Sequence, residues 1–233
     1  MTEMTQIHLL GGEKGGVGKS LVARLLAQYF IDHALAFTAF DADRSNGALL
    51  RFYAGYATPV LVDQYESLDT IVEAATGHPE RRILVDLAAQ AGEPLTRWMD
   101  ESQLLAVAPE LNLNIRYWHV MDLGRDSVEL LRQLFDRHES RLNYVLVQNQ
   151  LRGADFRIFN ESGLAARAQQ YHAPIIAIGP MHDSTLNKID AASSSFWAAT
   201  QDNDPHTGLG VLERTRLKGW LHSAYQAIGS VNP

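Results

Sequence analysis

The chain has 233 residues, 46% of them apolar, and a formal net charge of −7 at pH 7. Its length and composition predict one domain over residues 1–233 with a substantial core, and they exclude a disordered or low-complexity chain. No apolar run is long enough to span a bilayer and the first residues lack the pattern of a signal peptide, so we expect a cytoplasmic protein.

The chain contains no cysteine, which excludes disulfides, cysteine nucleophiles and thiolate-bound metal clusters. Its nine histidines show no metal-ligand spacing, so we expect no zinc site and no metal cluster. The negative net charge argues against a general affinity for nucleic acid, but it is compatible with a local basic patch.

A glycine-rich stretch at residues 12–20 follows the apolar run 7–10 and leads into an apolar-periodic segment, residues 19–32. This order predicts a strand, a phosphate-binding loop and a helix. The glycines let backbone N–H groups point at phosphate oxygens, and the helix adds its positive N-terminal dipole. We expect Lys19 to reach the β- and γ-phosphates and the Ser20 hydroxyl to bind Mg²⁺. The residues predicted to bind nucleotide in this loop are Gly15, Gly16, Val17, Gly18, Lys19 and Ser20.

Beyond the loop, predicted strands alternate with predicted helices. The strands are expected at residues 36–40, 82–87, 114–122, 144–148 and 173–179. Helices are expected at residues 68–75, 94–109 and 163–171 and through residues 130–135, with a loop containing short helical pieces at 48–65. Because helices of this length connect parallel strands, the pattern predicts an α/β fold with a doubly wound, mainly parallel sheet. Residues 201–210 are the nearest candidate for a linker, but the segment after them is too short for a second domain.

Three aspartates stand at or just after the ends of predicted strands: Asp41, Asp43 and Asp86. Open α/β sheets bind ligands at the carboxyl ends of their strands, and nucleotide hydrolysis needs a positioned water and a hydrated Mg²⁺. One such acid alone indicates little, because acids also cap helices. Together with the phosphate loop, they predict a magnesium site that includes Ser20, Asp41 and Asp86.

Residues Lys14 to Ser20 spell K-G-G-V-G-K-S, which resembles the deviant Walker A motif of the ParA/MinD superfamily of ATPases. The resemblance implies ATP and Mg²⁺ as ligands, an ATP-dependent homodimer and a protein partner that stimulates hydrolysis. It implies that Lys14 reaches across the dimer to the partner's nucleotide, so that the catalytic set is Lys14, Lys19 and Asp43.

The same resemblance assigns roles at the strand ends. Asp43 would orient the attacking water, Asp86 would hold Mg²⁺ through water, and Asn149 would contact adenine. Relatives often have D-x-D-P-Q and D-x-P where this chain has Asp43-Arg44-Ser45-Asn46 and Asp86-Leu87-Ala88. The missing prolines leave the shape of these two loops open. Some relatives hold an iron–sulfur cluster between subunits, for which this chain has no cysteine ligands.

Residues 187–190 spell N-K-x-D, the tetrad with which GTPases read guanine. In GTPases the tetrad directly follows a buried strand, whereas here seven residues, 180–186, intervene after the strand that ends near Gly179. We therefore expect the tetrad on a helix, as a coincidence. Asn149 does follow a strand directly, and this favours ATP over GTP.

The carboxyl-terminal segment, residues 212–228, has apolar residues mostly at helical spacing, with Arg214, Arg216 and Lys218 near them. We expect a last helix packed on the sheet; a DNA-binding or a peripheral membrane-binding helix are the alternatives. The aromatic residues Trp118, Phe196 and Trp197 are expected in the core or at a partner surface rather than stacked on bases.

The residues Gly12-Glu13, Ser195-Phe196-Trp197 and Lys218-Gly219-Trp220-Leu221 further resemble a ParA-like branch associated with plasmid mobilisation and transfer. The resemblance implies a switch that partitions, positions or transfers DNA or a protein cargo. Two alternatives remain open from the residues. One is a metabolic ligase or kinase acting on a small acid, and the other is a GTPase maturation factor.

Overall fold

The computed structural model describes residues 4–12, 15–44, 47–201 and 208–233. Its framework is a seven-stranded sheet with the order β3-β2-β4-β1-β5-β6-β7, in which every neighbouring pair is parallel. The predicted doubly wound α/β fold is therefore confirmed. The strands are β1 Thr5–Gly11, β2 Phe37–Asp41, β3 Ala57–Pro59, β4 Arg82–Asp86, β5 Leu113–Met121, β6 Asn143–Asn149 and β7 Ile175–Ile178.

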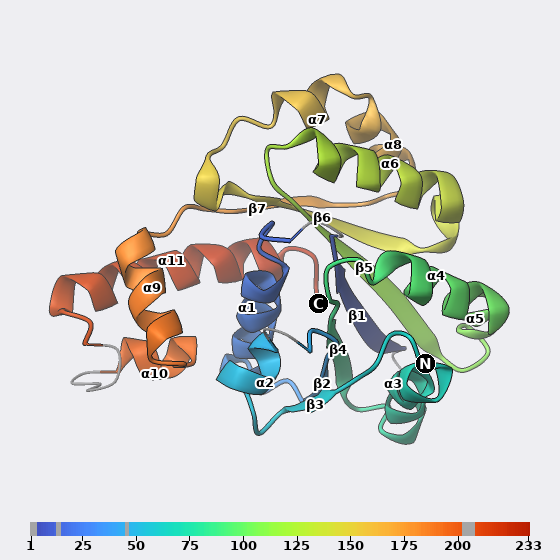
Figure 1. Ribbon diagram of the computed structural model, residues 1–233, viewed down its shortest axis with the longest axis horizontal. Coiled ribbons are helices and arrows are strands. Elements are labelled where there is room, and N and C mark those ends of the chain that lie inside the picture. The colour runs from blue at the N-terminus through green and yellow to red at the C-terminus, as the bar shows by residue number, and fades with distance from the viewer. Residues whose placement is uncertain (1–3, 13–14, 45–46, 202–207) are drawn as a thin grey trace.

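Helices cover both faces of the sheet (Figure 1). One face carries α1 Lys19–Asp32, α2 Ala48–Phe52, α9 Asp183–Ala191, α10 Phe196–Thr200 and α11 Val211–Gly229. The other carries α3 Tyr65–Gly77, α4 Gly92–Glu101, α5 Leu104–Val107, α6 Arg125–His138, α7 Arg157–Glu161 and α8 Leu164–Gln170. Each face has its own cluster of buried apolar side chains, since successive residues of a strand point to opposite sides.

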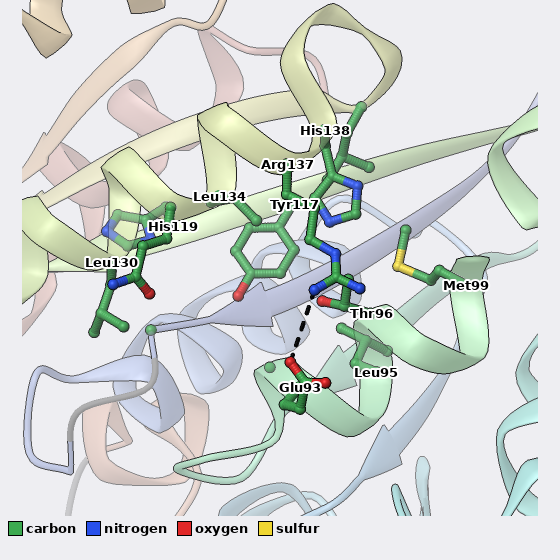
Figure 2. A pocket seen from close by; sticks show the side chains of 14 residues that line it. Glu93, Leu95, Thr96, Met99, Tyr117, His119, Leu130, Leu134, Arg137 and His138 are labelled. Carbon is green, nitrogen blue, oxygen red and sulfur yellow. Dashed lines mark ion pairs between the residues drawn. The ribbon is translucent and has the colours of Figure 1, made fainter. Parts of the chain in front are cut away.

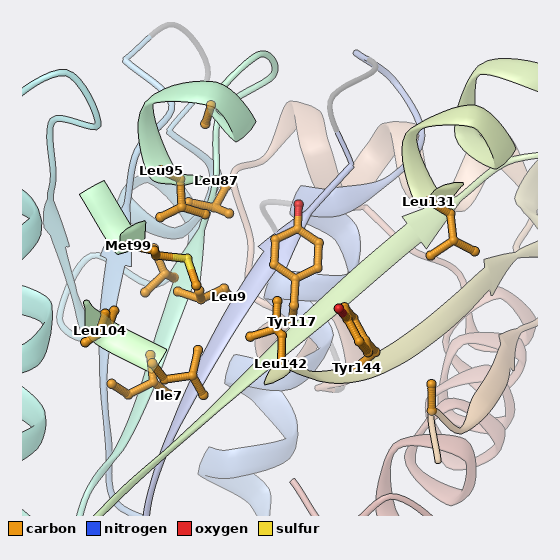
Figure 3. Packing of buried hydrophobic residues seen from close by; sticks show 14 of the residues in the cluster. Ile7, Leu9, Leu87, Leu95, Met99, Leu104, Tyr117, Leu131, Leu142 and Tyr144 are labelled. Carbon is orange, nitrogen blue, oxygen red and sulfur yellow. The ribbon is translucent and has the colours of Figure 1, made fainter. Parts of the chain in front are cut away.

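Figure 3 shows part of the core that lies between the sheet and α4 to α6. Ile7 and Leu9 of β1 point into it and pack with Leu95 and Met99 of α4, whereas Leu10 belongs to the cluster beneath α1. Tyr117 of β5 also lies in this core, and it is 6% exposed. Its phenol occupies the space above β1 where a side chain at Gly11 would begin, which explains the glycine at the end of β1.

The structure corrects three local predictions. Residues 48–65, expected as a loop with short helical pieces, contain α2 and also the short edge strand β3, which pairs with β2. The helix expected over 94–109 is divided into α4 and α5, because Gln103 adopts a left-handed φ of 50° between them. The helix expected at 163–171 is α8, and it is preceded by the unpredicted α7.

The carboxyl-terminal helix α11 packs on the sheet, as expected. Its own side chains Leu217, Leu221 and Ile228 are buried. The indole of Trp220, also in α11, donates a hydrogen bond of 2.8 Å to the Gly179 carbonyl, just after β7. Trp118 and Phe196 are fully buried, whereas Trp197 is 57% exposed. Within the described ranges, no helix is long and apolar enough to cross a membrane. Most of residues 201–210, the linker candidate, lies outside the described residues.

Candidate functional site

The phosphate loop lies at the centre of the carboxyl edge of the sheet. It follows β1, which lies between β4 and β5 in the sheet. The chain passes from β4 on one side of β1 to β5 on the other side, so the direction of the strand order changes at this point. Such a switch point is where open α/β sheets hold their ligands. Gly15 and Gly16 are exposed in the loop, Val17 is buried, and Lys19 begins α1. The predicted strand, loop and helix are therefore all present.

Gly18 is the residue at which the loop turns into α1. Its φ of 99° is a conformation that favours glycine. A Cβ atom there would lie only 2.2 Å from the Asn149 side-chain nitrogen. That amide donates a hydrogen bond of 2.7 Å to the Val17 carbonyl and accepts one of 3.2 Å from the Leu151 N–H. Asn149, predicted as the adenine contact, thus holds the phosphate loop against the end of β6, a contact that the sequence did not indicate.

Lys19, Ser20 and Asp86 come together beside the loop. Lys19 is 7% exposed, and the Asp86 carboxylate, at the end of β4, is fully buried. Neither oxygen of Asp86 has a hydrogen bond of normal geometry within the described residues. Burial, followed by the charge of Asp41, raises the pKa of Asp86 to about 7, while the nearby Ser20 hydroxyl and Lys19 ammonium act in the opposite direction. A buried carboxylate beside the serine and the lysine of a phosphate loop is suited to a cation or to its bound water.

Asp41 lies beside Asp86 in the β2/β4 register. Its two carboxylate oxygens accept backbone hydrogen bonds of 3.0 Å from Asp43, 2.8 Å from Leu49 and 3.1 Å from Leu50. Burial nevertheless raises the pKa of Asp41, because desolvation outweighs these bonds. The Asp41 oxygens thus organise the segment between β2 and α2, and the metal role of Asp41 stays a prediction. Asp43 lies in this segment, and its side chain is half-buried.

The sequence thus predicted most of the residues that the structure gathers at this edge: Ser20, Lys19, Asp41, Asp43, Asp86 and Asn149. The predicted dimer-bridging residue Lys14 lies outside the described residues, and its role stays a prediction. Within the described ranges, no group of three or more histidines or acids could hold a metal ion by itself. A magnesium ion here would therefore depend on phosphate and water oxygens for most of its ligands.

Two residues of the tetrad 187–190 are engaged in ion pairs. The tetrad lies on α9, as predicted, where the Lys188 ammonium is 2.9 Å from the Glu213 carboxylate. Asp190 accepts a hydrogen bond of 2.7 Å from Arg24, whose guanidinium carbon lies 3.6 Å from the centre of the Phe52 ring. Both charged side chains of the tetrad are therefore bound within the fold, which fits the interpretation as a coincidence.

We predict an asymmetric effect of removing either member of the Arg24–Asp190 pair. Asp190→Ala leaves the buried Arg24 cation without its carboxylate and should reduce the free energy of unfolding by about 2 kcal/mol, less than for a fully buried pair because Asp190 is half-exposed. Arg24→Met keeps the apolar packing and should be nearly neutral. Urea unfolding checks both variants. A large loss of GTP affinity in Asp190→Ala without destabilisation would contradict this assignment and favour a guanine site.

A cavity of about 120 Å³ lies on the opposite face of the sheet from α1, between α4 and α6 (Figure 2). Tyr117 and His119 of β5 line it, and an ion pair of 3.7 Å between Arg137 and Glu93 joins the two helices. Gly12 lines it too, so the cavity reaches the start of the phosphate loop. It is mostly apolar and does not contain the acids of the carboxyl edge, so it is not the phosphate-binding region itself.

The fold and its site were compared with known proteins. MinD cell division protein of Aquifex aeolicus superposes with a TM-score of 0.55 over 92% of this chain and 97% of its own, at 14% sequence identity. McdA of Cyanothece, in a complex with ATP, superposes with a TM-score of 0.50 over 98% of both chains, at 12% identity. Both structures share the fold that the resemblance to the ParA/MinD superfamily implies.

Sequence comparison adds two curated relatives of this chain. Protein MobD of Acidithiobacillus ferrooxidans is 24% identical over 229 residues, which are 97% of each chain. Protein TraL of Escherichia coli is 26% identical over 154 residues, which are 63% of this chain and 64% of TraL. Both names fit the mobilisation and transfer branch that the sequence resembles. No family model matches the chain.

Proposed function

We propose that this ParA/MinD-like chain is an ATPase that forms an ATP-dependent homodimer and acts as a switch in partitioning, positioning or transfer of DNA or a protein cargo. The observation that carries the proposal is the buried Asp86 carboxylate, which lies beside Lys19 and Ser20 and has no hydrogen bond of normal geometry to the described residues. Burying a carboxylate whose oxygens make no hydrogen bond of normal geometry is costly, so its position favours a ligand that supplies positive charge. The MinD-like fold and the McdA complex with ATP support ATP as the nucleotide.

Mg²⁺ fits the residues on this edge. Ser20 would bind it directly and Asp86 through water, and the ion would neutralise charge on the β- and γ-phosphates. Asp41 contributes by fixing the backbone of the segment that carries Asp43. Lys19 is buried against the loop and would hold the phosphates, and Asp43 would orient the attacking water.

Dimerisation and partner binding complete the proposed cycle. Lys14 would neutralise charge on the second subunit's nucleotide, so that ATP stabilises the dimer and hydrolysis dissolves it. A MinC:MinD complex of the Aquifex protein supports a protein partner as the receiver of the signal. DNA is a further candidate ligand for the cations Arg214, Arg216 and Lys218. A membrane surface is the less favoured one, because α11 buries Leu217, Leu221 and Ile228 in the fold and exposes only Val211 and Leu212 among its large aliphatic side chains.

Light scattering with ATP, ADP and no nucleotide tests the dimer. We expect a dimer with ATP only, and we expect Lys14→Ala to weaken dimerisation about tenfold or more while nucleotide binding to the monomer persists. Arg132→Ala, which removes a partly exposed cation on α6, is the charge-matched control. Repeating the measurement with added DNA and with liposomes identifies the ligand of the dimer. A Lys14→Ala protein that dimerises normally would contradict the proposed role of this lysine.

Asp43→Ala tests the hydrolytic step. We expect the variant to bind ATP and to stay dimeric, because without Asp43 the water is not oriented for attack. Phosphate release and light scattering measure the two properties, and normal hydrolysis by Asp43→Ala would overturn the assignment. Competition between ATP and GTP separates the ATPase from a GTPase maturation factor. ATP turnover that requires an added metabolite would instead favour a ligase or kinase.

A further inference from the structure

Arg152 lies against the phosphate loop. It belongs to the short 3-10 turn Gln150–Arg152 directly after β6, and one of its terminal nitrogens is 3.6 Å from the position that a Cβ atom would take at Gly16. Gly16 itself has a φ of 83° and is exposed. The guanidinium group of Arg152 therefore lies within contact distance of the loop at Gly16, which has no side chain of its own.

The turn that carries Arg152 is fixed to the loop through Asn149. The Asn149 amide donates to the Val17 carbonyl and accepts from the Leu151 N–H, so one side chain joins the loop to the residue directly before Arg152. The turn closes with a hydrogen bond of 3.1 Å from the Gly153 N–H to the Gln150 carbonyl. The position of the arginine relative to the loop is thereby set before any ligand binds, which lowers the entropy lost on binding.

The guanidinium of Arg152 makes no hydrogen bond or ion pair within the part of the chain that the structure describes. Other exposed arginines do pair, such as Arg157 with Asp155 at 2.7 Å and Arg137 with Asp100 at 2.8 Å. Lys19, one of the two lysines of the loop, is buried. Arg152 thus brings a further, exposed positive charge and a set of unused donors to the loop.

We propose that Arg152 binds a phosphate group of the nucleotide and adds a cation from outside the phosphate loop to the lysines within it. This inference rests on the proposed function, since it adds a residue to the same nucleotide site. A guanidinium presents parallel N–H donors that match two phosphate oxygens, and charge-assisted bonds of this kind are stronger than neutral ones. The phosphate can belong to the nucleotide of the same subunit or to that of a second copy across the dimer, and the chemistry is the same in both.

The experiment compares Arg152→Ala, Arg152→Lys and the control Arg132→Ala with the unsubstituted chain. Arg132 is an exposed arginine on α6 that pairs with Glu129 at 3.4 Å, so its removal makes the same change of net charge away from the loop. Titration calorimetry measures the affinity for ATP, ADP and AMP with Mg²⁺ at concentrations at which the protein is monomeric. Light scattering measures dimerisation with ATP.

If the phosphate is in the same subunit, Arg152→Ala weakens ATP binding to the monomer by about ten- to a hundredfold, because a charge-assisted bond is lost. If it belongs to the second copy, monomer binding is unchanged and the ATP-dependent dimer weakens by a similar factor. In either case Arg152→Lys restores part of the loss and Arg132→Ala behaves like the unsubstituted chain.

Equal monomer affinity and equal dimerisation in Arg152→Ala would overturn the inference while the proposed function stands. Absence of nucleotide binding in the unsubstituted chain would overturn both. Thermal unfolding without nucleotide checks that Arg152→Ala is folded, and we expect no change in its melting temperature because Arg152 is exposed and makes no bond to the described residues.

Discussion

Gly18→Ala is expected to lower the affinity for ATP by about 100-fold. The alanine must adopt a φ of 99°, which L-residues rarely take, and its Cβ would stand 2.2 Å from the Asn149 nitrogen. The loop can accommodate the new atom only by breaking the bond from Asn149 to the Val17 carbonyl. Strain and a lost buried hydrogen bond together amount to about 2 to 3 kcal/mol, which corresponds to roughly the expected factor.

A double-mutant cycle separates the two causes. Asn149→Ala alone removes the amide and should weaken ATP binding by about tenfold, since the loop loses its bond to β6. In the double variant Gly18→Ala/Asn149→Ala, the steric overlap between the new Cβ and the Asn149 amide is gone, but the strained backbone at residue 18 remains. The losses of ATP-binding free energy in the two single variants should therefore be less than additive. Gly219→Ala in α11, where no atom lies within 4 Å of the added Cβ, is the matched control and should bind ATP normally. Unchanged ATP affinity in Gly18→Ala would contradict the assignment of this loop to phosphate.

The contribution of the buried histidines to the free energy of unfolding is expected to fall as the pH drops below about 6.5. His8 of β1 and His119 of β5 are fully buried, and burial lowers the pKa of both side chains, that of His119 to about 4. Burial also lowers the pKa of His138. At these histidines the unfolded chain binds more protons than the folded chain between the two pKa values, so their contribution to stability is complete above about pH 6.5 and is lost as the pH falls toward 4. Asp86, whose pKa is raised to about 7, contributes in the opposite direction over this range, so the histidine effect is measured as a difference between variants. For His119 alone the loss is about 3 kcal/mol.

Urea unfolding from pH 7.5 to 4 measures this effect. His119→Gln can keep a hydrogen bond to the Ser127 carbonyl, which His119 contacts at 2.9 Å, but it cannot be protonated. Its free energy of unfolding should therefore depend less on pH than that of the unsubstituted chain, by about the contribution given for His119. His222→Gln, at an exposed position of α11, should leave the pH dependence unchanged. Parallel pH profiles for His119→Gln and the unsubstituted chain would show that His119 is not buried as a neutral group.

Sequence patterns within short segments were sufficient to predict much of the fold and of the candidate site. The buried strands, the phosphate loop and α1 are each contiguous, so their residue types can be recognised without knowing what packs against them. The acids Asp41 and Asp86 could be placed at one edge because the ends of parallel strands meet there. The position of 187–190 on a helix followed from its distance to the preceding strand, and the structure agrees.

Other features depend on contacts that no local pattern contains. The edge strand β3 exists because β2 offers it hydrogen bonds, and its three residues carry no readable alternation. The division of the segment 94–109 into α4 and α5 depends on how both helices pack on the sheet. The hydrogen bonds from the Leu49 and Leu50 N–H groups to the Asp41 carboxylate likewise depend on how the chain turns after β2, which no local pattern shows.

The sequence by itself determined that this chain has a phosphate loop between a buried strand and a helix, and that acids follow the neighbouring strands, because these are properties of consecutive residues. Only the tertiary structure decided which residue fixes the loop in place and which cation outside the loop lies next to it. Asn149 contacts Val17 across 132 positions of the chain, and Arg152 reaches Gly16 through the same turn. Such contacts arise when β6 is placed in the sheet near β1, and that placement is a property of the whole fold.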